Sequence, residues 1–581
     1  MQHLYEIDVQ VPMRDGVALA ANVWHPAAGE APTLLVRLPY GKDVMGFGQS
    51  AIPDLLALVE AGYAVVVQDC RGTHRSEGEF VPHMADRNDG EDTVAWIAGQ
   101  PWSDGTVGMY GPSYLGMVQW ETAVTGVPAL KAIAPTFTSI DNYEAPWYSA
   151  GGALSLSLVT WWNAIMYTAD AQRSLAAGED TLSQLQQLGR AALFPEPLND
   201  VLPTAEVPVL REYGKWWDDW MAHPSHDGYW DAMELTPELK NVSAPALNIG
   251  GWYDLYIGQT LRTYVTARQK AGSAQAREGQ RLIIGPWDHM SASGLYPDRS
   301  FGPLASAQML GLTSLHVKFF DRWLRGDTTA LDGVAPVKIF VMGIDQWRDE
   351  QEWPLPDTRW TDFHLTSTGH ANTADGDGVL TIQAPTDAGQ ETYLYDPRRP
   401  VLSAGGASMP TTFGFWGPVD QRTVAAREDV LCFATPVLEE AVEVTGPVSL
   451  TLYVSSSAVD TDFTAKLVDV FPDGKAINLC DGILRTRYRN GLATQELMEP
   501  GTVYEITIDM TGTSNVFLPG HRIRVDISSS NFPRYDRNTN TGGVIAHESE
   551  DQMIPAINHI HHGPNHPSRL VLPVIDRKNQ S

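Results

Sequence analysis

The stretch YGPSYLG at residues 110–116 decides the fold of this chain. An apolar run precedes it at residues 107–110, and a run compatible with a helix follows it at residues 117–122. Its glycines let the backbone reverse from strand to helix within a few residues, and they leave space where side chains would collide. The pattern therefore predicts a sharp turn that presents the hydroxyl of Ser113 to a substrate, with an ordinary glycine-rich turn as the alternative.

The order of three residue types along the chain supports the catalytic interpretation. In α/β-hydrolases the nucleophilic serine comes first, then an acid, then a histidine. Here Asp254 and His289 follow Ser113, and each comes just after an apolar run typical of a strand. Because reaction sites of open α/β sheets gather at the carboxyl edge of the strands, we expect the three side chains to meet there as nucleophile, acid and base.

Structural alternatives exist for both partners of the serine. An aspartate after a strand often only caps a helix, and a lone histidine is commonly structural. Asp288 is a second candidate for the acid, but a side chain adjacent to His289 in sequence is poorly placed to accept a hydrogen bond from its ring. The sequence therefore favours Asp254. The long gap between Ser113 and Asp254 predicts an inserted segment.

Acyl transfer also needs donors that stabilise an oxyanion. The backbone amide of Tyr114, directly after the serine, is one expected donor. The loop after the strand-like residues 34–37 has no run of glycines but carries Tyr40, so its phenol is the candidate for the second donor. A turn tyrosine packed over Pro39 is the alternative.

The pattern along the chain predicts an α/β-hydrolase core, a helical cap and a β domain. Strand and helix patterns alternate over residues 1–140 and 236–355, which favours a largely parallel sheet with helices on its faces. Residues 141–235 show helical spacing and many tryptophans, most of which we expect in the core of the cap. Two prolines within residues 353–357 mark a linker. Over residues 356–581, apolar and polar residues alternate with a period of two, which indicates an antiparallel sandwich.

Composition narrows the partners and the compartment. A net charge of −30 disfavours nucleic acid and anionic membrane surfaces, both of which require a basic face. The three cysteines form no disulfide framework, and neither a secretory signal nor an apolar run of membrane-spanning length is visible, so we expect a cytoplasmic protein. The sequence is compatible with a homodimer and does not require one.

Two further groups of residues are interpreted as structural. Asp69 and Arg71, just after a buried strand, are predicted to fix a loop. Histidines gather near the end of the chain without an acid or cysteine at ligand spacing, so we predict a surface loop there and no metal site. These histidines are His559, His561, His562 and His566.

Segments spread over essentially the whole chain carry a family resemblance. They are residues 11–17, 68–72, 76–80, 113–116, 145–148, 285–287 and 454–473. In them the chain resembles the family that holds bacterial cocaine esterases, X-Pro dipeptidyl peptidases and α-amino-acid ester hydrolases. The elbow of that family is similar to G-x-S-Y-x-G, which accommodates Leu115 before Gly116.

The resemblance implies the same site residues: Ser113 as nucleophile, His289 as base, Asp254 as acid, and Tyr40 with the Tyr114 amide as oxyanion hole. It also implies a jelly roll for the last domain. The implied activity is that of a serine carboxylesterase that acts on small esters of aromatic acids through an acyl-enzyme, with no metal or organic cofactor.

The resemblance further implies an aromatic acyl pocket. Two departures put the choice of substrate in question: a tyrosine stands at residue 256 where the esterase has phenylalanine, and a Leu-Phe pair of the esterase has no clean match over residues 407–416. An X-Pro dipeptidyl peptidase or α-amino-acid ester hydrolase is one alternative, and it would need pocket carboxylates for a substrate ammonium. A non-catalytic carbohydrate-binding protein is the other. The implied pocket residues are Trp147, Trp162, Tyr256, Ile165 and Phe413.

Overall fold

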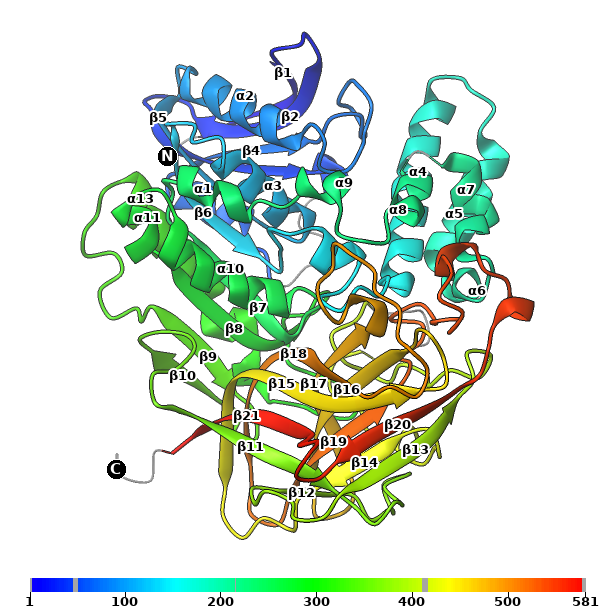
Figure 1. Cartoon of the computed structure of the whole chain (residues 1–581). Coiled ribbons are helices and arrows are strands. Elements are labelled where there is room, and N and C mark those ends of the chain that lie inside the picture. Colours follow the sequence, from blue (N-terminus) through cyan, green and yellow to red (C-terminus); the bar gives the residue numbers. More distant parts are fainter. Residues whose placement is uncertain (1–2, 45–50, 215, 410–415, 577–581) are drawn as a thin grey trace.

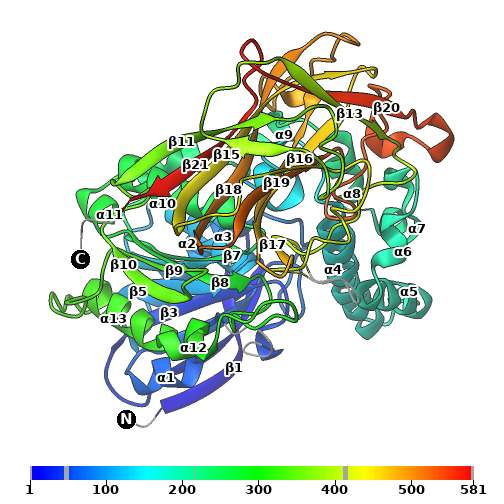
Figure 2. The same cartoon turned by 90° about the horizontal axis from the view of Figure 1, so that it is seen from below.

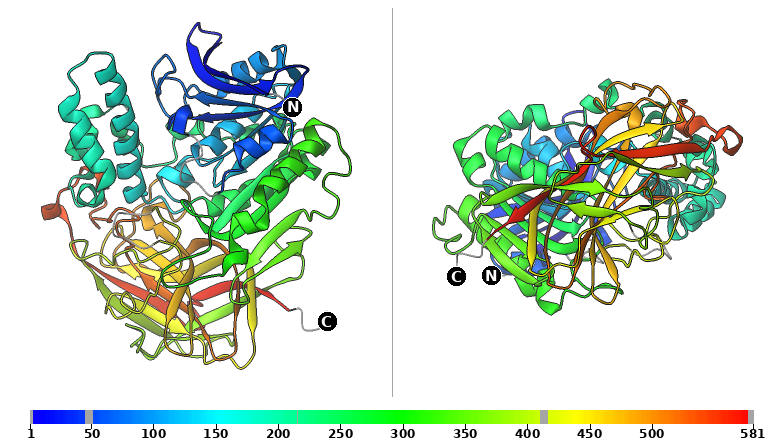
Figure 3. Two further views of the ribbon diagram at one scale, coloured as in Figure 1. Left: turned by 180° about the vertical axis from the view of Figure 1, so that it is seen from behind. Right: turned by 60° about the horizontal axis from the view of Figure 1, so that its bottom comes forward.

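The computed structural model describes residues 3–44, 51–214, 216–409 and 416–576, which form two sheets and a helical segment beside them (Figure 1). Figure 3 shows the same three parts from behind, with the helical segment standing apart from the first sheet. Among the described residues, no helix is both long and apolar enough to cross a bilayer.

The first sheet has ten strands in the order β1-β2-β4-β3-β5-β6-β7-β8-β9-β10. From β4 through β9 neighbouring strands run parallel, while β1, β2 and β10 pair antiparallel. Every residue of β3 and β4 is buried, as expected for central strands covered on both faces. The strands are β1 (His3–Pro12), β2 (Ala18–Pro26), β3 (Ala31–Leu38), β4 (Ala64–Asp69), β5 (Ser103–Pro112), β6 (Leu130–Thr136), β7 (Leu247–Tyr253), β8 (Arg281–Asp288), β9 (Val337–Val341) and β10 (Gln346–Glu350).

Helices cover both faces of this sheet, as the alternating pattern predicts. Figure 2 shows α2, α3, α10 and α11 on one side of the strands and α1, α12 and α13 on the other. These helices are α1 (Leu55–Glu60), α2 (Asp86–Ala98), α3 (Tyr114–Ala123), α10 (Ile257–Lys270), α11 (Ala274–Glu278), α12 (Ala307–Leu310) and α13 (Leu312–Leu324).

The helical segment enters between β6 and β7, in the gap that the sequence left between Ser113 and Asp254. Most of its tryptophans are core residues, as predicted: Trp216, Trp217, Trp220 and Trp230 are almost wholly buried. The helices are α4 (Leu156–Ala176), α5 (Leu182–Leu193), α6 (Glu196–Asn199), α7 (Pro208–Tyr213), α8 (Trp217–Ala222) and α9 (Gly228–Asp231).

The second sheet has eleven strands, paired antiparallel except for β12 with β14. Backbone bonds tie it to the first sheet, because the N–H of Met342 donates to the carbonyl of Ser514 and the N–H of Val516 donates back to Met342. Its strands are β11 (Thr358–Thr366), β12 (Val379–Thr381), β13 (Gly389–Tyr395), β14 (Leu431–Ala434), β15 (Val442–Ser456), β16 (Asp462–Val470), β17 (Ala476–Arg485), β18 (Tyr504–Phe517), β19 (Arg522–Ser528), β20 (Ala556–His562) and β21 (Arg569–Ile575).

The prediction of a surface loop for the four histidines is wrong for three of them. His559, His561 and His562 lie on β20, which pairs with β13 and β15. Their ring nitrogens bond to the hydroxyls of Thr392, Ser455 and Ser367, respectively. Pairing with neighbouring strands thus stabilises this polar stretch as a strand.

A buried ion cluster joins the second sheet to the helical segment. Arg485 on β17 pairs with Asp462 at 2.9 Å and with Asp536 at 2.8 Å. Asp536 also accepts a 3.0 Å bond from the N–H of Leu154, just before α4. The three charged side chains are nearly inaccessible to solvent. Their contacts with one another therefore take the place of the water that would otherwise hydrate their charges.

Replacing Asp536 by alanine (Asp536→Ala) should therefore destabilise the protein by about 3–5 kcal/mol, because the charge of Arg485 would lose a partner while buried. The measurement is the melting temperature, with Asp387→Ala, an exposed aspartate of the same domain, as the control. Equal melting temperatures for the two variants would contradict the expectation.

Candidate active site

Ser113 occupies a sharp elbow between β5 and α3. Its φ of 61° lies in the left-handed region, which is strained for a residue with a side chain and is typical of nucleophile elbows. A Cβ on Gly111 would lie 2.7 Å from the Cβ of Leu115, and one on Gly116 would lie 2.7 Å from the Cβ of Thr138. Gly111 therefore leaves room for the turn itself, and Gly116 lets α3 pack against the residues after β6.

The elbow meets His289 and Asp254 at the carboxyl edge of the sheet. His289 follows β8, and its Nε2 lies 3.0 Å from the Oγ of Ser113. Asp254 follows β7, and its Oδ1 lies 2.7 Å from the Nδ1 of His289. Asp254 is fully buried, and its second oxygen accepts a 3.0 Å bond from the N–H of Tyr256. The carboxylate is thus fixed where it can hold the imidazole with Nε2 facing the hydroxyl.

Asp288, the competing acid, is engaged elsewhere. Its Oδ1 accepts bonds from the backbone N–H groups of Met290 and Ser291, at 2.8 and 3.0 Å. These bonds shape the turn that carries His289 and leave the imidazole to Asp254.

Tyr40 and Tyr114 bring two donors to the other side of Ser113. Tyr40 lies in the loop after β3, and its phenol accepts a 3.0 Å bond from the indole N–H of Trp162. Burial raises the pKa of Tyr40 to about 12, so the phenol is protonated at neutral pH and can donate. Tyr114 opens α3, where backbone N–H groups have no acceptor within the helix.

Charges at the end of β4 fix neighbouring loops, which confirms the structural interpretation of Asp69 and Arg71. Asp69 accepts a 2.6 Å bond from the N–H of Lys42, two residues after Tyr40. Arg71 pairs with Asp89 at 2.6 Å and with Asp15 at 2.8 Å. Neither side chain is among the residues that line the cavity at Ser113.

A cavity opens beside Ser113. Trp147, Trp162, Tyr256 and Ile165 line it together with Tyr40, Tyr114 and His289, whereas Phe413 lies outside the described residues. Sequence reasoning missed several apolar residues that complete the wall. Of these residues, only Trp161 had a signal in the sequence, because it neighbours Trp162 in a stretch of helical spacing. The residues without a signal are Met117, Pro146, Leu158, Leu255, Met290 and Met409.

The hydroxyl of Tyr256 is a polar group in this largely apolar wall. The residue is 4% exposed, and its ring centroid lies 5.4 Å from that of His289. Burial raises its pKa well above the usual value for tyrosine, so the group is a neutral phenol.

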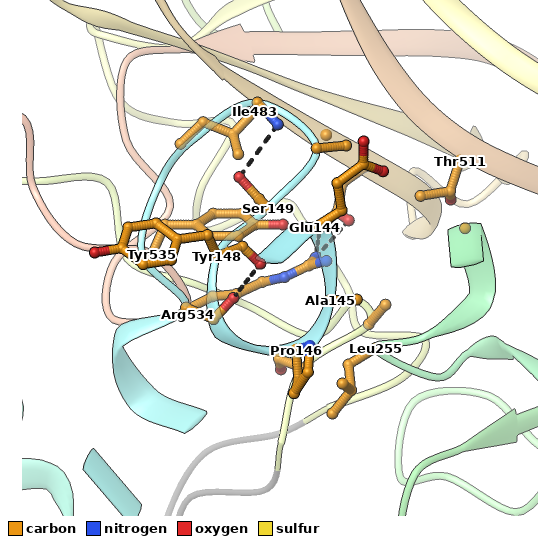
Figure 4. Close-up of a pocket in the computed structure, with 18 of the residues that line it drawn as sticks. Glu144, Ala145, Pro146, Tyr148, Ser149, Leu255, Ile483, Thr511, Arg534 and Tyr535 are labelled. Carbon is orange, nitrogen blue, oxygen red and sulfur yellow. Dashed lines mark hydrogen bonds and ion pairs between the residues drawn. The ribbon is translucent and has the colours of Figure 1, made fainter. Parts of the chain in front are cut away.

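A second, polar cavity adjoins the first across shared wall residues that include Pro146 and Leu255 (Figure 4). Its acidic side chains contact arginines: Glu144 and Asp509 share Arg262, at 2.6 and 2.7 Å, and Asp481 pairs with Arg534. Each carboxylate next to the acyl cavity thus already contacts a cation of the protein itself.

Comparisons with known proteins place the chain among serine hydrolases. Residues 15–291 match the family model described as X-Pro dipeptidyl-peptidase (S15 family), and residues 330–571 match the X-Pro dipeptidyl-peptidase C-terminal non-catalytic domain. Cocaine esterase from Rhodococcus sp. is 51% identical over 576 residues, which cover 98% of each chain.

Solved structures agree over nearly the full length. An aminopeptidase from a marine sediment Thaumarchaeota archaeon is 25% identical with a TM-score of 0.80, covering 99% of this chain and 96% of that one. An α-amino acid ester hydrolase, 24% identical, also superposes with a TM-score of 0.80, covering 98% and 96%, and shows the same fold.

Proposed function

Because this chain belongs to the S15 family of X-Pro dipeptidyl-peptidases, which makes it a serine hydrolase, we propose that it is a carboxylesterase for small esters of aromatic, benzoyl-like acids. The observation that carries the proposal is the cavity beside Ser113: aromatic rings and aliphatic side chains form most of its wall, and its described lining includes no carboxylate. A flat apolar acyl group fits such a wall, whereas a substrate ammonium would be left without a counter-charge.

The proposed mechanism follows from the distances at Ser113. His289 accepts the serine proton at Nε2 as Oγ attacks the ester carbonyl, while Asp254 stabilises the imidazolium through Nδ1–H. The Tyr40 phenol and the Tyr114 amide donate to the oxyanion. His289 then protonates the departing alcohol, and water repeats the sequence on the acyl-enzyme. No step requires a metal or an organic cofactor.

The proposed division of labour assigns the chemistry to residues 1–140 and 236–355. Residues 141–235 act as a cap, an assignment supported by Trp162 on α4, which lines the cavity and bonds to Tyr40. Residues 356–581 form a jelly roll, for which the antiparallel pairing of the second sheet is the support.

The decisive experiment compares two acyl groups, benzoyl and Gly-Pro, on the same p-nitroaniline leaving group. We expect the p-nitroanilide of benzoic acid to be hydrolysed faster than Gly-Pro p-nitroanilide. The ester p-nitrophenyl benzoate should be hydrolysed fastest of all. Ser113→Ala should abolish turnover and labelling by a fluorophosphonate. Faster cleavage of the Gly-Pro anilide would identify an X-Pro peptidase, and a wild-type protein that no fluorophosphonate labels would fit a non-catalytic binding protein.

Tyr40→Phe tests the oxyanion donor. Loss of one such donor should lower kcat by roughly 10²–10³-fold. The loss should be the same at about pH 8 and about pH 10.5, because a phenol of pKa about 12 stays protonated at both, whereas an ordinary tyrosine would be mostly ionised at the higher pH. Tyr453→Phe, which removes a hydroxyl of β15 that donates to Glu505 in an exposed hydrogen bond, is the control. A loss that shrinks as pH rises would contradict the protonated donor.

Tyr256→Phe tests the polar group in the acyl wall. An unsubstituted benzoyl group that packs there leaves the phenol partly unsatisfied, so removal of the hydroxyl should raise kcat/KM for a benzoyl ester roughly tenfold. An ester whose ring carries a hydroxyl is the matched control and should gain less. A fall in kcat/KM for both esters would show that the hydroxyl serves the reaction itself.

A further inference from the structure

A buried carboxylate lies beneath the oxyanion side of the site. The phenol of Tyr114 donates to Oδ2 of Asp86 at 2.6 Å and accepts a 3.0 Å bond from the N–H of His83. The His83 ring stacks on the Tyr114 ring at a centroid distance of 4.6 Å. Tyr114 and Asp86 are 2% and 3% exposed, so the side chain next to the proposed nucleophile is held at its far end as well as by its backbone.

The same carboxylate also reaches the segment that carries Tyr40. Arg37 on β3 is fully buried, and its guanidinium donates to Oδ1 of Asp86 at 3.2 Å and to the Asp86 carbonyl at 2.8 Å. Arg37 precedes Tyr40 by three residues in the same strand and loop. Asp86, on the first turn of α2, therefore contacts both segments that carry the two proposed donors.

We propose that Asp86 is a positioning residue that fixes the spacing between the Tyr40 phenol and the Tyr114 amide. The inference rests on the oxyanion hole of the proposed function. Donors stabilise a transition state only when they are held where its charge develops, and a displacement of about 1 Å can cost 10²-fold in rate. A charge-assisted link between α2, α3 and β3 supplies that rigidity, because neither segment can shift without breaking a buried bond to Asp86.

A metal site is the competing interpretation of this cluster. His83, Asp86 and Glu121 are the one group of three possible metal ligands in the described ranges. Both oxygens of Asp86 are already bonded, one to Tyr114 and one to Arg37, and His83 Nδ1 lies 2.8 Å from Glu121. A cation would have to enter beside the buried guanidinium and displace these partners, so the charges favour the positioning role.

Two variants test the link from its two ends. Tyr114→Phe removes the bond to Asp86 and keeps the backbone amide, and Asp86→Asn removes the charge. Both should lower kcat about tenfold and leave KM within twofold of the wild-type value. Phenylboronic acid forms a tetrahedral adduct, so its inhibition should weaken about tenfold, whereas inhibition by benzoate should be unchanged. Glu121→Gln is the matched control: it neutralises another buried carboxylate of the cluster, one that bonds to His83, and should alter stability but not kcat.

The rate at which a fluorophosphonate labels Ser113 keeps this test independent of the substrate. The labelling should slow in Tyr114→Phe even if benzoyl esters prove to be poor substrates, in which case the proposed function fails and the positioning role stands. Unchanged kcat, boronate affinity and labelling in a folded Tyr114→Phe variant would overturn the proposal. So would equal losses of kcat in Asp86→Asn and Glu121→Gln, or loss of wild-type labelling after treatment with EDTA.

Discussion

The backbone of Ser113 is the constraint on which the site depends. A left-handed conformation at a residue with a side chain costs of order 1–3 kcal/mol, and it persists only where the surroundings compensate. Here the N–H of Ser113 donates to the carbonyls of Thr136 and Phe137, and Gly111 and Gly116 leave room where a Cβ would collide with Leu115 and Thr138. The turn ends β5, starts α3 and leaves the hydroxyl at the carboxyl edge of the sheet. The loops after β7 and β8 end at the same edge, so His289 and Asp254 need no long excursion to reach it.

Three segments distant in sequence meet at the proposed oxyanion donors beside Ser113. The loop after β3 brings Tyr40, the start of α3 brings Tyr114, and α4 brings Trp162, whose indole donates to the Tyr40 phenol. That bond uses an acceptor lone pair and leaves the phenol proton available for a ligand. Under these groups Arg37 and Asp86 are held in a pair from which solvent is almost excluded. Such a pair adds little net stability, because desolvation opposes the attraction, but it permits few geometries.

Sequence reasoning predicted that Ser113, Asp254 and His289 would meet, because local pattern and chain order determine where they lie. The elbow motif and the strand ends before Asp254 and His289 were sufficient, because parallel strands present their carboxyl ends at one edge. The apolar wall was harder to predict from the sequence. Leu158 comes from a helix and Met409 from a loop between strands of the second sheet, and no local pattern distinguishes them from core residues. His83 and Asp86 gave no signal, since their partners lie on other elements. The loop prediction for His559 is wrong because pairing between distant strands outweighs weak local propensity.

The family contains both peptidases and esterases, so the charge at the acyl wall becomes the physical basis for choosing between them. An ammonium buried beside aromatic rings needs a carboxylate within a few ångströms, or its desolvation opposes binding. Glu144 is the acidic residue of the adjoining cavity nearest in sequence to the aromatic wall, and it already contacts Arg262, which it shares with Asp509, and accepts a further bond from Gln259. Tyr256, two residues after Asp254, instead supplies an uncharged phenol. The described wall can therefore hydrogen-bond to a neutral acyl group, but it carries no charge to compensate a cationic one.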